Sequence, residues 1–274
     1  MAAVRCPASS QICASSRSNG TGPTSASAAA AEAASAVAAA EGERDTSVSN
    51  MYLTIPGGYD KPGEPRSWQT TRVTALKLPT LPFALEPEGS PPPGCRIRNG
   101  VLTLTAAANT DLFVDPASVD PEQVPDAGRF TGLPPAGDFT LAAQVSVEFA
   151  SMYDAGVLLL HAAERRWAKL CFEYSPQLKP TAVTVVTRDT SDDCNSFEVD
   201  GRTLWLRITR SGAAWAFHAS TDGAWWRLLR YFTLGADLVR VGFLAQSPTG
   251  EGCAATFDHI TFRPGAPGNL RDGS

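Results

Sequence analysis

The feature that most constrains the fold of this chain is a regular alternation of apolar and polar residues. Between Asp138 and Phe149 the odd positions are all apolar, whereas most even positions are polar. Positions 204 to 209 alternate in the same way, with leucine or isoleucine at each even position. A period of two indicates a β-strand with one buried face. No long amphipathic helix is indicated after residue 50, so the body of the chain is predicted to be all-β.

Four turn dipeptides separate the apolar runs and indicate how the strands connect. They are Asn99-Gly100, Asp200-Gly201, Ser211-Gly212 and Asp222-Gly223. Such pairs suit the positive φ angles of the tight turns that join antiparallel strands. We therefore expect four hairpins. Because no helices are indicated that could cover a parallel sheet, the predicted fold is a sandwich of two antiparallel sheets.

Composition divides the chain into four parts. Residues 1–49 are rich in Ala and Ser and contain no aromatic residue, so they bury too little surface to offset the entropy of ordering and are expected to be a disordered tail. We expect a Pro- and Gly-rich linker over 50–75, the sandwich over 76–264 and a disordered C-terminal tail over 265–274. The start of the chain resembles an organelle transit peptide in composition, although ordinary low-complexity sequence explains it equally well. The expected location is the cytoplasm or, if residues 1–40 are a transit peptide, a chloroplast or mitochondrion.

The charge balance argues against one class of partner. The chain has 23 basic and 28 acidic side chains and a formal net charge of −5, whereas phosphate backbones are bound by clustered Lys and Arg. No nucleic-acid partner is expected. No membrane span is expected either, because the one long apolar run is alanine, which is too weakly apolar. The six cysteines contain no CxxC pair, so we expect free thiols.

No metal or cofactor is expected. His161, His218 and His259 lie far apart without the spacing of metal ligands, and the motifs of P-loop, dinucleotide-binding and zinc-protease sites are absent. The acidic stretch 189–193 could hold Ca²⁺, which needs about six to eight oxygen ligands. A solvated turn explains this stretch more simply.

The segment 167–174 is the most informative for function. In a strand, Leu170, Phe172 and Tyr174 point to one face, which is apolar and predicted to be core. The opposite face carries Trp167, Lys169 and Glu173 with Cys171. A flat ring, a donor and an acceptor in one row suit a polar ligand. The alternative is an exposed sheet face on which the Lys and Glu form a solvated pair while the Trp packs under a loop.

Five groups of residues occur in order along the chain: Tyr153-Asp154-Ala155-Gly156, Trp167 with Lys169 and Glu173, Ser191-Asp192, Ser220-Thr221-Asp222-Gly223 with Trp225, and Gly242-Phe243 with Ser247-Pro248. As an ordered set, these motifs resemble the DUF1349 family. The match covers roughly residues 76 to 264, and it implies a concanavalin A-like jelly-roll sandwich with a concave face. The family is similar to concanavalin A-like lectins and glucanases, includes the fungal regulator-of-enolase proteins, and brings no established reaction. One departure is Ser191-Asp192-Asp193, where the family tends to have Ser-Asp-Trp.

Three functions follow as hypotheses. The first is a non-catalytic sandwich that binds a carbohydrate or similar polar small molecule on its concave face. The second, implied by the resemblance, is a regulatory domain that docks another protein such as a glycolytic enzyme. The third is a glycoside hydrolase or lyase, which needs two facing carboxyl groups; we assign no catalytic residue. The expected ligand-binding residues are Trp167 for stacking, Lys169 and Arg207 as donors, Glu173, Asp154 and Asp192 as acceptors, and Tyr153 at the rim.

The third hypothesis lacks the usual motif. Glu198 and Asp200 form the one Glu-x-Asp pair in the body of the chain, and Gly201 follows directly. This places the pair at a predicted hairpin turn rather than inside a strand. Glu173 could instead face Asp154 or Asp192 across neighbouring strands.

Overall fold

A computed structural model describes residues 75–118 and 126–274, together with the backbone of 52–56 and 68–72. All regular structure in these ranges is β-strand, so they include no helix that could cross a membrane. The expected tail 1–49 lies outside the described residues. Two strands lie within the expected linker, β1 (Tyr52–Pro56) and β2 (Trp68–Arg72), and they pair antiparallel.

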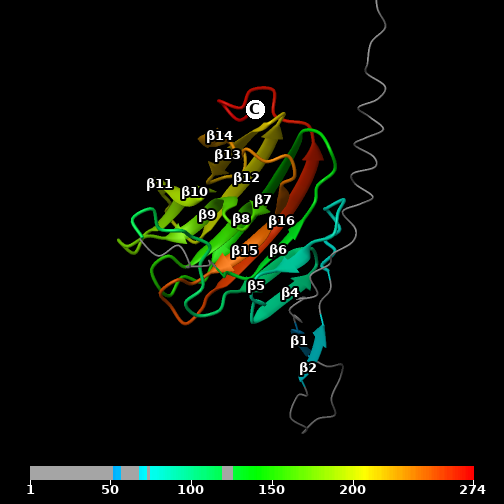
Figure 1. Ribbon diagram of the computed structural model, residues 1–274, viewed down its shortest axis with the longest axis vertical. Coiled ribbons are helices and arrows are strands. Elements are labelled where there is room, and N and C mark those ends of the chain that lie inside the picture. The colour runs from blue at the N-terminus through cyan, green and yellow to red at the C-terminus, as the bar shows by residue number, and fades with distance from the viewer. Residues whose placement is uncertain (1–51, 57–67, 73–74, 119–125) are drawn as a thin grey trace, which may run out of the picture. The chain divides into compact units, whose positions relative to one another are not determined.

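The main body consists of two seven-stranded antiparallel sheets (Figure 1). Sheet I has the order β11 (Thr190–Glu198), β10 (Pro180–Arg188), β9 (Arg166–Tyr174), β8 (Ala155–Ala163), β15 (Arg240–Gln246), β6 (Arg129–Gly132) and β3 (Glu86–Glu88). Sheet II has the order β14 (Arg227–Thr233), β13 (Ala214–Ser220), β12 (Thr203–Ser211), β7 (Phe139–Val147), β16 (Ala254–Pro264), β5 (Val101–Thr105) and β4 (Gly94–Arg98). The predicted two-sheet antiparallel sandwich is confirmed.

The alternation read from the sequence sorts the side chains onto two faces. Leu141 and Val145 of β7, Leu206 of β12 and Leu170 of β9 are fully buried in one large cluster that includes residues of both sheets. A second, smaller buried cluster includes Trp167 and Cys171, which alternate with the core residues of β9. Sheet I is therefore buried on both faces over part of its area. The four cysteines of the described ranges, Cys95, Cys171, Cys194 and Cys253, are free thiols.

Three of the four turn dipeptides form hairpins as predicted. Asn99-Gly100 joins β4 to β5 with φ angles of 52° and 82°, while Ser211-Gly212 and Asp222-Gly223 join β12 to β13 and β13 to β14. The fourth prediction is wrong, because Asp200-Gly201 connects β11 of sheet I to β12 of sheet II. A turn dipeptide reports a local reversal of the chain and does not specify whether the two strands pair.

The C-terminal segment 265–274, expected to be disordered, is instead held on the outer face of sheet II. Arg207 of β12 donates from Nη2 to the carbonyl of Gly273 at 2.9 Å, and His218 Nε2 donates to the carbonyl of Leu270 at 2.8 Å. The guanidinium of Arg207 lies 4.3 Å from the ring centroid of Trp226. The prediction of disorder was based on composition alone. Composition does not reveal that the buried donors of Arg207 and His218 need backbone carbonyls as acceptors, which this segment supplies.

Glu88 forms a cluster of ion pairs on β3, which is the edge strand of sheet I farthest from β11. It contacts Arg240 Nε at 2.9 Å, His161 Nδ1 at 3.0 Å and Arg129 Nε at 3.3 Å, and it accepts a hydrogen bond from Thr131 at 2.7 Å. Burial by itself would raise the pKa of Glu88, but the hydrogen bonds and the nearby cations lower it to about 2. The charged carboxylate thus ties the three-residue strand β3 to β6, β8 and β15.

Replacing Glu88 with glutamine is expected to lower the free energy of unfolding by about 1 to 2 kcal/mol at pH 7. Because the folded-state pKa is depressed, this stabilisation is present above pH 4.5 and is lost as the pH falls toward about 2. Urea denaturation of both proteins from pH 2 to 7 measures the difference. The control is Glu86→Gln, whose side chain is 61% exposed beside Arg240 and whose effect is expected to stay below about 0.5 kcal/mol. Equal losses in the two variants would contradict the assignment.

Candidate functional site

A cavity of about 670 Å³ lies on the outer face of sheet I. Strands β9, β10 and β11 form its floor, and loops that precede or follow other strands form its walls. Its polar floor residues come from alternate positions of the strands, as the pairing register requires. The lining residues are Asp111, Phe113, Asp115, Tyr153, Lys169, Glu173, Pro176, Val183, Val185, Asp193, Asn195, Gln246, Pro248 and Thr249.

The register across three strands explains why these side chains share one face. Val185 of β10 pairs with Lys169 of β9 on one side and with Asp193 of β11 on the other. Residues directly opposite one another in an antiparallel sheet point to the same face. The prediction that Lys169 and Glu173 point away from the inter-sheet core is therefore confirmed.

Residues 110–118, called the strap below, cross the outer face of sheet I and form one wall of the cavity. The strap is tied at its start and in its middle by backbone bonds, from Thr110 to Ser247 at 3.3 Å and from Ser191 to the carbonyl of Val114 at 2.9 Å. Ser191 Oγ also accepts a hydrogen bond from the amide of Val114 at 2.9 Å. Leu112 and Val114 are buried in the second cluster, the one that contains Trp167.

Trp167 was expected to stack against a ligand, and this expectation is wrong because the strap covers its side chain. Its side chain points to the outer face of sheet I, as predicted, but its exposed fraction is 0% because Leu112 and Val114 belong to the same packed cluster. It therefore has no surface on which a ligand could stack. Strand alternation specifies the face of a residue, whereas the covering of that face depends on a segment far away in the sequence.

Lys169 is a buried ammonium with two polar partners. Its Nζ donates to Asp111 Oδ1 at 3.1 Å and to Gln246 Oε1 at 3.0 Å, and the residue is 1% exposed. Burial alone would lower its pKa, but the negative charges of Asp111 and Glu173 outweigh that effect and raise the pKa. Lys169 therefore stays charged and links β9, the strap and β15.

Glu173 differs from Lys169 because its carboxyl group has no hydrogen-bond or ion-pair partner among the described residues. The residue is 9% exposed and lines the cavity. Burial raises the pKa of Glu173 to about 8; Lys169 opposes this shift, and the negative charges of Asp111 and Asp193 add to it. A buried carboxyl group that opens only to a cavity is the chemical feature most available to a ligand.

The other predicted acceptors are engaged elsewhere. Asp154 is fully buried and accepts hydrogen bonds from the amides of Ala150 and Ser151, each at 2.8 Å, and from the hydroxyl of Ser247 at 2.6 Å. It therefore stabilises a loop and has no free oxygen surface. Asp192 accepts a hydrogen bond from Arg230 of β14 at 2.9 Å and does not line the cavity. Both expectations are corrected, since neither side chain lies beside Glu173.

Arg207 is also absent from the cavity. It lies on β12 of sheet II, under the C-terminal segment, whereas Lys169 and Glu173 lie on sheet I. The expectation that it joins Lys169 as a donor is corrected. Tyr153, by contrast, lines the cavity, where it was expected at the rim. Its exposed fraction is 36%, and its φ angle is 69°.

Sequence reasoning missed the residues that complete the cavity. Asp193 was read as part of an acidic loop and Asn195 was not considered, but Thr190–Glu198 is strand β11, so Asp192 and Asp193 point to opposite faces. That arrangement removes the loop on which a Ca²⁺ site was considered. No group of three or more His, Cys, Asp or Glu side chains suited to a metal ion occurs in the described ranges. Asp111 and Gln246 were missed because they are 58 and 77 residues away from Lys169.

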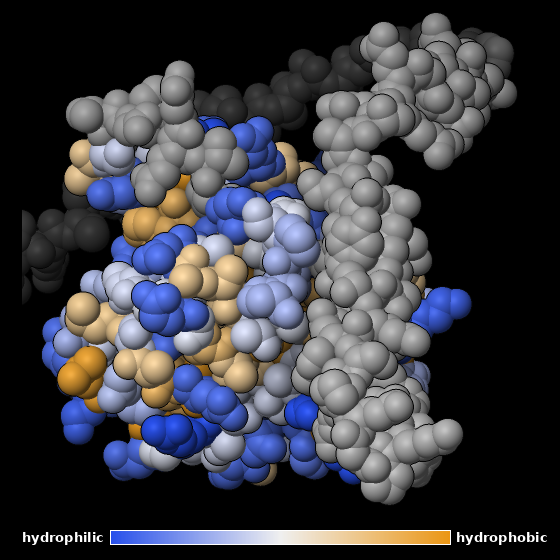
Figure 2. All heavy atoms as spheres, turned by 90° about the horizontal axis from the view of Figure 1, so that it is seen from below, coloured by the Kyte–Doolittle hydropathy of each residue, from blue (hydrophilic) through white to orange (hydrophobic). Residues whose placement is uncertain are grey.

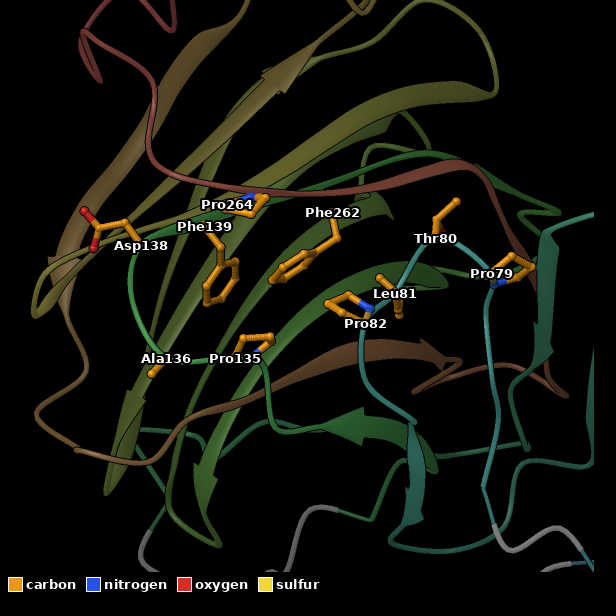
Figure 3. A pocket seen from close by; sticks show the side chains of 10 residues that line it. All are labelled: Pro79, Thr80, Leu81, Pro82, Pro135, Ala136, Asp138, Phe139, Phe262 and Pro264. Atoms are coloured by element: carbon orange, nitrogen blue, oxygen red, sulfur yellow. The ribbon is translucent and has the colours of Figure 1, made fainter.

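A second cavity of about 440 Å³ is mainly apolar. Figure 3 shows the rings of Phe139 and Phe262 facing Pro82 and Pro135, while Asp138 points away from the shared space. The two phenyl rings are stacked with centroids 5.0 Å apart. Asp138 is already used as an acceptor by the amide of Gly212. This cavity therefore offers little to orient a polar ligand, and the cavity on sheet I is the stronger candidate.

Comparisons with known proteins agree with the fold. Regulation of enolase protein 1 of Saccharomyces cerevisiae is 27% identical over 134 residues, which are 48% of this chain and 67% of that protein. A solved structure of a functionally unknown protein from Saccharomyces cerevisiae has a TM-score of 0.58 at 21% identity and covers 66% of this chain and 96% of its own. The GH43B protein of a Bacteroides ovatus xyloglucan locus has a TM-score of 0.52 at 16% identity over 75% of this chain and 42% of its own. At these identities the two structures establish the fold alone.

The family comparison shows to which family the chain belongs. The family described as "Protein of unknown function (DUF1349)" matches residues 90–265, which include most of both sheets and the residues of the cavity. The match extends over more than half of the chain. The chain therefore belongs to the DUF1349 family.

Proposed function

We propose that this protein is a non-catalytic β-sandwich that binds a carbohydrate or a similar polar small molecule in the cavity of sheet I. The observation that carries the proposal is Glu173, a buried carboxyl group that lines the cavity and has no partner among the described residues. A fully buried polar group without a hydrogen bond costs about 1 to 3 kcal/mol, and Glu173, which is 9% exposed and opens to the cavity, bears part of that cost. A ligand that donates to Glu173 would remove that cost.

The rest of the cavity suits a hydroxylated molecule. Its volume of about 670 Å³ falls within the range of roughly 300 to 1,000 Å³ that is typical of small-molecule sites. Asn195 offers an amide group and Asp193 a carboxylate. Val183 and Val185 of β10 form an apolar strip between β9 and β11. Phe113 supplies a ring on the strap side. Sugars combine hydroxyl groups with apolar C–H faces, so this mixture matches them.

Catalysis is not part of the proposal. Cleavage of a glycoside requires two carboxyl groups about 5 to 9.5 Å apart on either side of the bond. The two candidates predicted to pair with Glu173 were Asp154 and Asp192, and both are bound outside the cavity. We assign no catalytic role to the other carboxylates that line the cavity, Asp111, Asp115 and Asp193. Glu198 is at the end of β11, before the connection to sheet II, and does not line the cavity. A relative of the same fold has a name that refers to xyloglucan, which supports a sugar ligand and no particular reaction.

A glycan array followed by calorimetry on the tightest ligand tests the proposal. Filling the cavity floor by Val183→Trp is expected to weaken binding at least about tenfold, because the larger ring occupies the ligand's volume. Asp192→Asn is the matched control, since Asp192 is on a floor strand but does not line the cavity. Circular dichroism verifies that both variants fold. Absence of binding to every sugar on the array, or equal affinity in both variants, would refute the proposal.

A second candidate function is regulation of another protein. The observation in its favour is the name of the yeast relative, which refers to regulation of enolase. On the face seen in Figure 2, hydrophilic residues surround small groups of apolar ones, and no broad apolar patch extends across its uncovered part. Trp225 is 61% exposed, and exposed tryptophans are frequent anchors of interfaces. Sedimentation of purified enolase with the full chain and with Trp225→Ala tests this candidate directly.

A further inference from the structure

The charges that face the cavity of sheet I are mainly negative. Four of its lining residues are acidic, Asp111, Asp115, Asp193 and Glu173, and the basic lining residue is Lys169. Lys169 is already paired with Asp111 at 3.1 Å. Asp193 and Glu173 have no cation within ion-pair distance among the described residues. The cavity therefore has an excess of negative charge that its own side chains do not neutralise.

Glu173 is the group for which this excess matters most. Asp115 and Asp193 are exposed and can be hydrated, whereas Glu173 is 9% exposed, so its ionised form would have little hydration to stabilise it. An unpaired charge in such a position is costly, so the carboxyl group either holds a proton or pairs with a cation from outside. The structure offers space for that cation on one side only, in the cavity.

We propose that the ligand of this cavity carries an ammonium group that pairs with Glu173, so that amino sugars or similar hydroxylated amines bind in preference to neutral sugars. This inference rests on the proposed function and specifies its ligand class. Asp193 and Asp115 attract the cation into the cavity from a distance. Lys169 opposes it, but its charge is balanced by Asp111 at 3.1 Å.

Binding of such a ligand is coupled to release of a proton. Because burial raises the pKa of Glu173 to about 8, the free protein holds a proton on this carboxyl group at neutral pH. The groups that face it are Lys169 and Cys171 on its own strand, Asp111 on the strap, Asp193 on β11 and Tyr153 at the rim. An ammonium pairs with the ionised form, so the proton is transferred to the buffer as the ion pair forms. A neutral sugar can bind the protonated form and releases no proton.

A matched pair of sugars separates these cases. The glucosamine trimer and the N-acetylglucosamine trimer have the same rings and linkages, and they differ at each C2 nitrogen, which is a basic amine in one and a neutral amide in the other. Calorimetry in two buffers of different ionisation enthalpy measures affinity and proton release together. At pH 7 we expect the glucosamine trimer to bind at least about tenfold more tightly and to release a proton, up to one per Glu173.

Two variants test whether Glu173 is responsible. Glu173→Gln is expected to abolish both the preference and the proton release, while Asp192→Asn, which removes one negative charge outside the cavity, leaves both unchanged. Asp193→Asn is a second cavity variant on an exposed side chain and is expected to weaken binding of the glucosamine trimer a few-fold. If both trimers bind equally without proton release, the ammonium inference is overturned while the proposed function stands. If neither trimer nor any neutral oligosaccharide binds, both are overturned.

Discussion

Replacing Lys169 with methionine is expected to lower the free energy of unfolding by about 2 to 4 kcal/mol at pH 7. The substitution keeps the apolar stem but removes the ammonium from a site that is 1% exposed. Asp111 then loses its ion pair and Gln246 loses a donor. Removing one partner of a buried pair is usually more costly than replacing both. Because the side chain of Asp111 is 33% exposed, water takes over part of the lost interaction and limits the effect.

Urea denaturation at pH 7 measures this loss as a shift in midpoint. The double variant Lys169→Met, Asp111→Asn is expected to regain about half of the lost stability, because it removes the uncompensated carboxylate. Lys179→Met is the control, since the Lys179 side chain is exposed, and its effect is expected to stay within about 0.5 kcal/mol. A Lys169→Met protein as stable as the parent would mean that the pair does not stabilise the strap.

Glu173→Gln is expected to have the opposite effect and to make the protein more stable at alkaline pH. The folded-state pKa of about 8 lies above the ordinary value of 4.5. Below pH 4.5 the carboxyl group is protonated in both states, so the two proteins differ little. As the pH rises toward 8 the unfolded chain ionises while the folded one resists, and the parent loses stability that the glutamine variant keeps. At pH 9 the gain is expected to be on the order of 5 kcal/mol, from the difference between the two pKa values.

Thermal unfolding of both proteins from pH 4 to 9 measures this gain. The difference in melting temperature is expected to be small at pH 4, to increase up to about pH 8 and then to stay constant. Glu164→Gln, at an exposed turn position, is the control and is expected to show no such increase. Melting curves that shift in parallel at all pH values would contradict the buried, unpaired state of Glu173. A variant that is more stable but no longer binds the ligand would identify Glu173 as a residue kept for function at a cost in stability.

The sequence allowed some parts of the fold and the site to be predicted because the signals were local. Alternation along 167–174 specified that Lys169 and Glu173 share the face opposite to Leu170, and the structure agrees. The same signal failed to distinguish which sheet an outward residue belongs to. Arg207 alternates just as clearly, yet it lies on sheet II beneath the C-terminal segment.

The remaining errors concern contacts between distant parts of the chain. Trp167 was predicted on the correct face, but no local pattern reveals that Leu112 and Val114 cover it. Asp111 and Gln246 are too far from Lys169 in the sequence for spacing to connect them. The acidic stretch 189–193 was read as a loop, although most of it belongs to β11, since an edge strand with little burial carries a weak periodic signal.

The strap has a consequence for how binding preferences could diverge among proteins of this architecture. The floor of the cavity consists of hydrogen-bonded strands whose inner residues also form the core, so substitutions there affect the whole sandwich. One wall is the single crossing segment 110–118, tied to the sheet through Ser247 and Ser191. Changes in that segment at positions other than Asp111, Leu112 and Val114, which pair with Lys169 or pack in the second cluster, would alter which molecules are accepted with little effect on the scaffold.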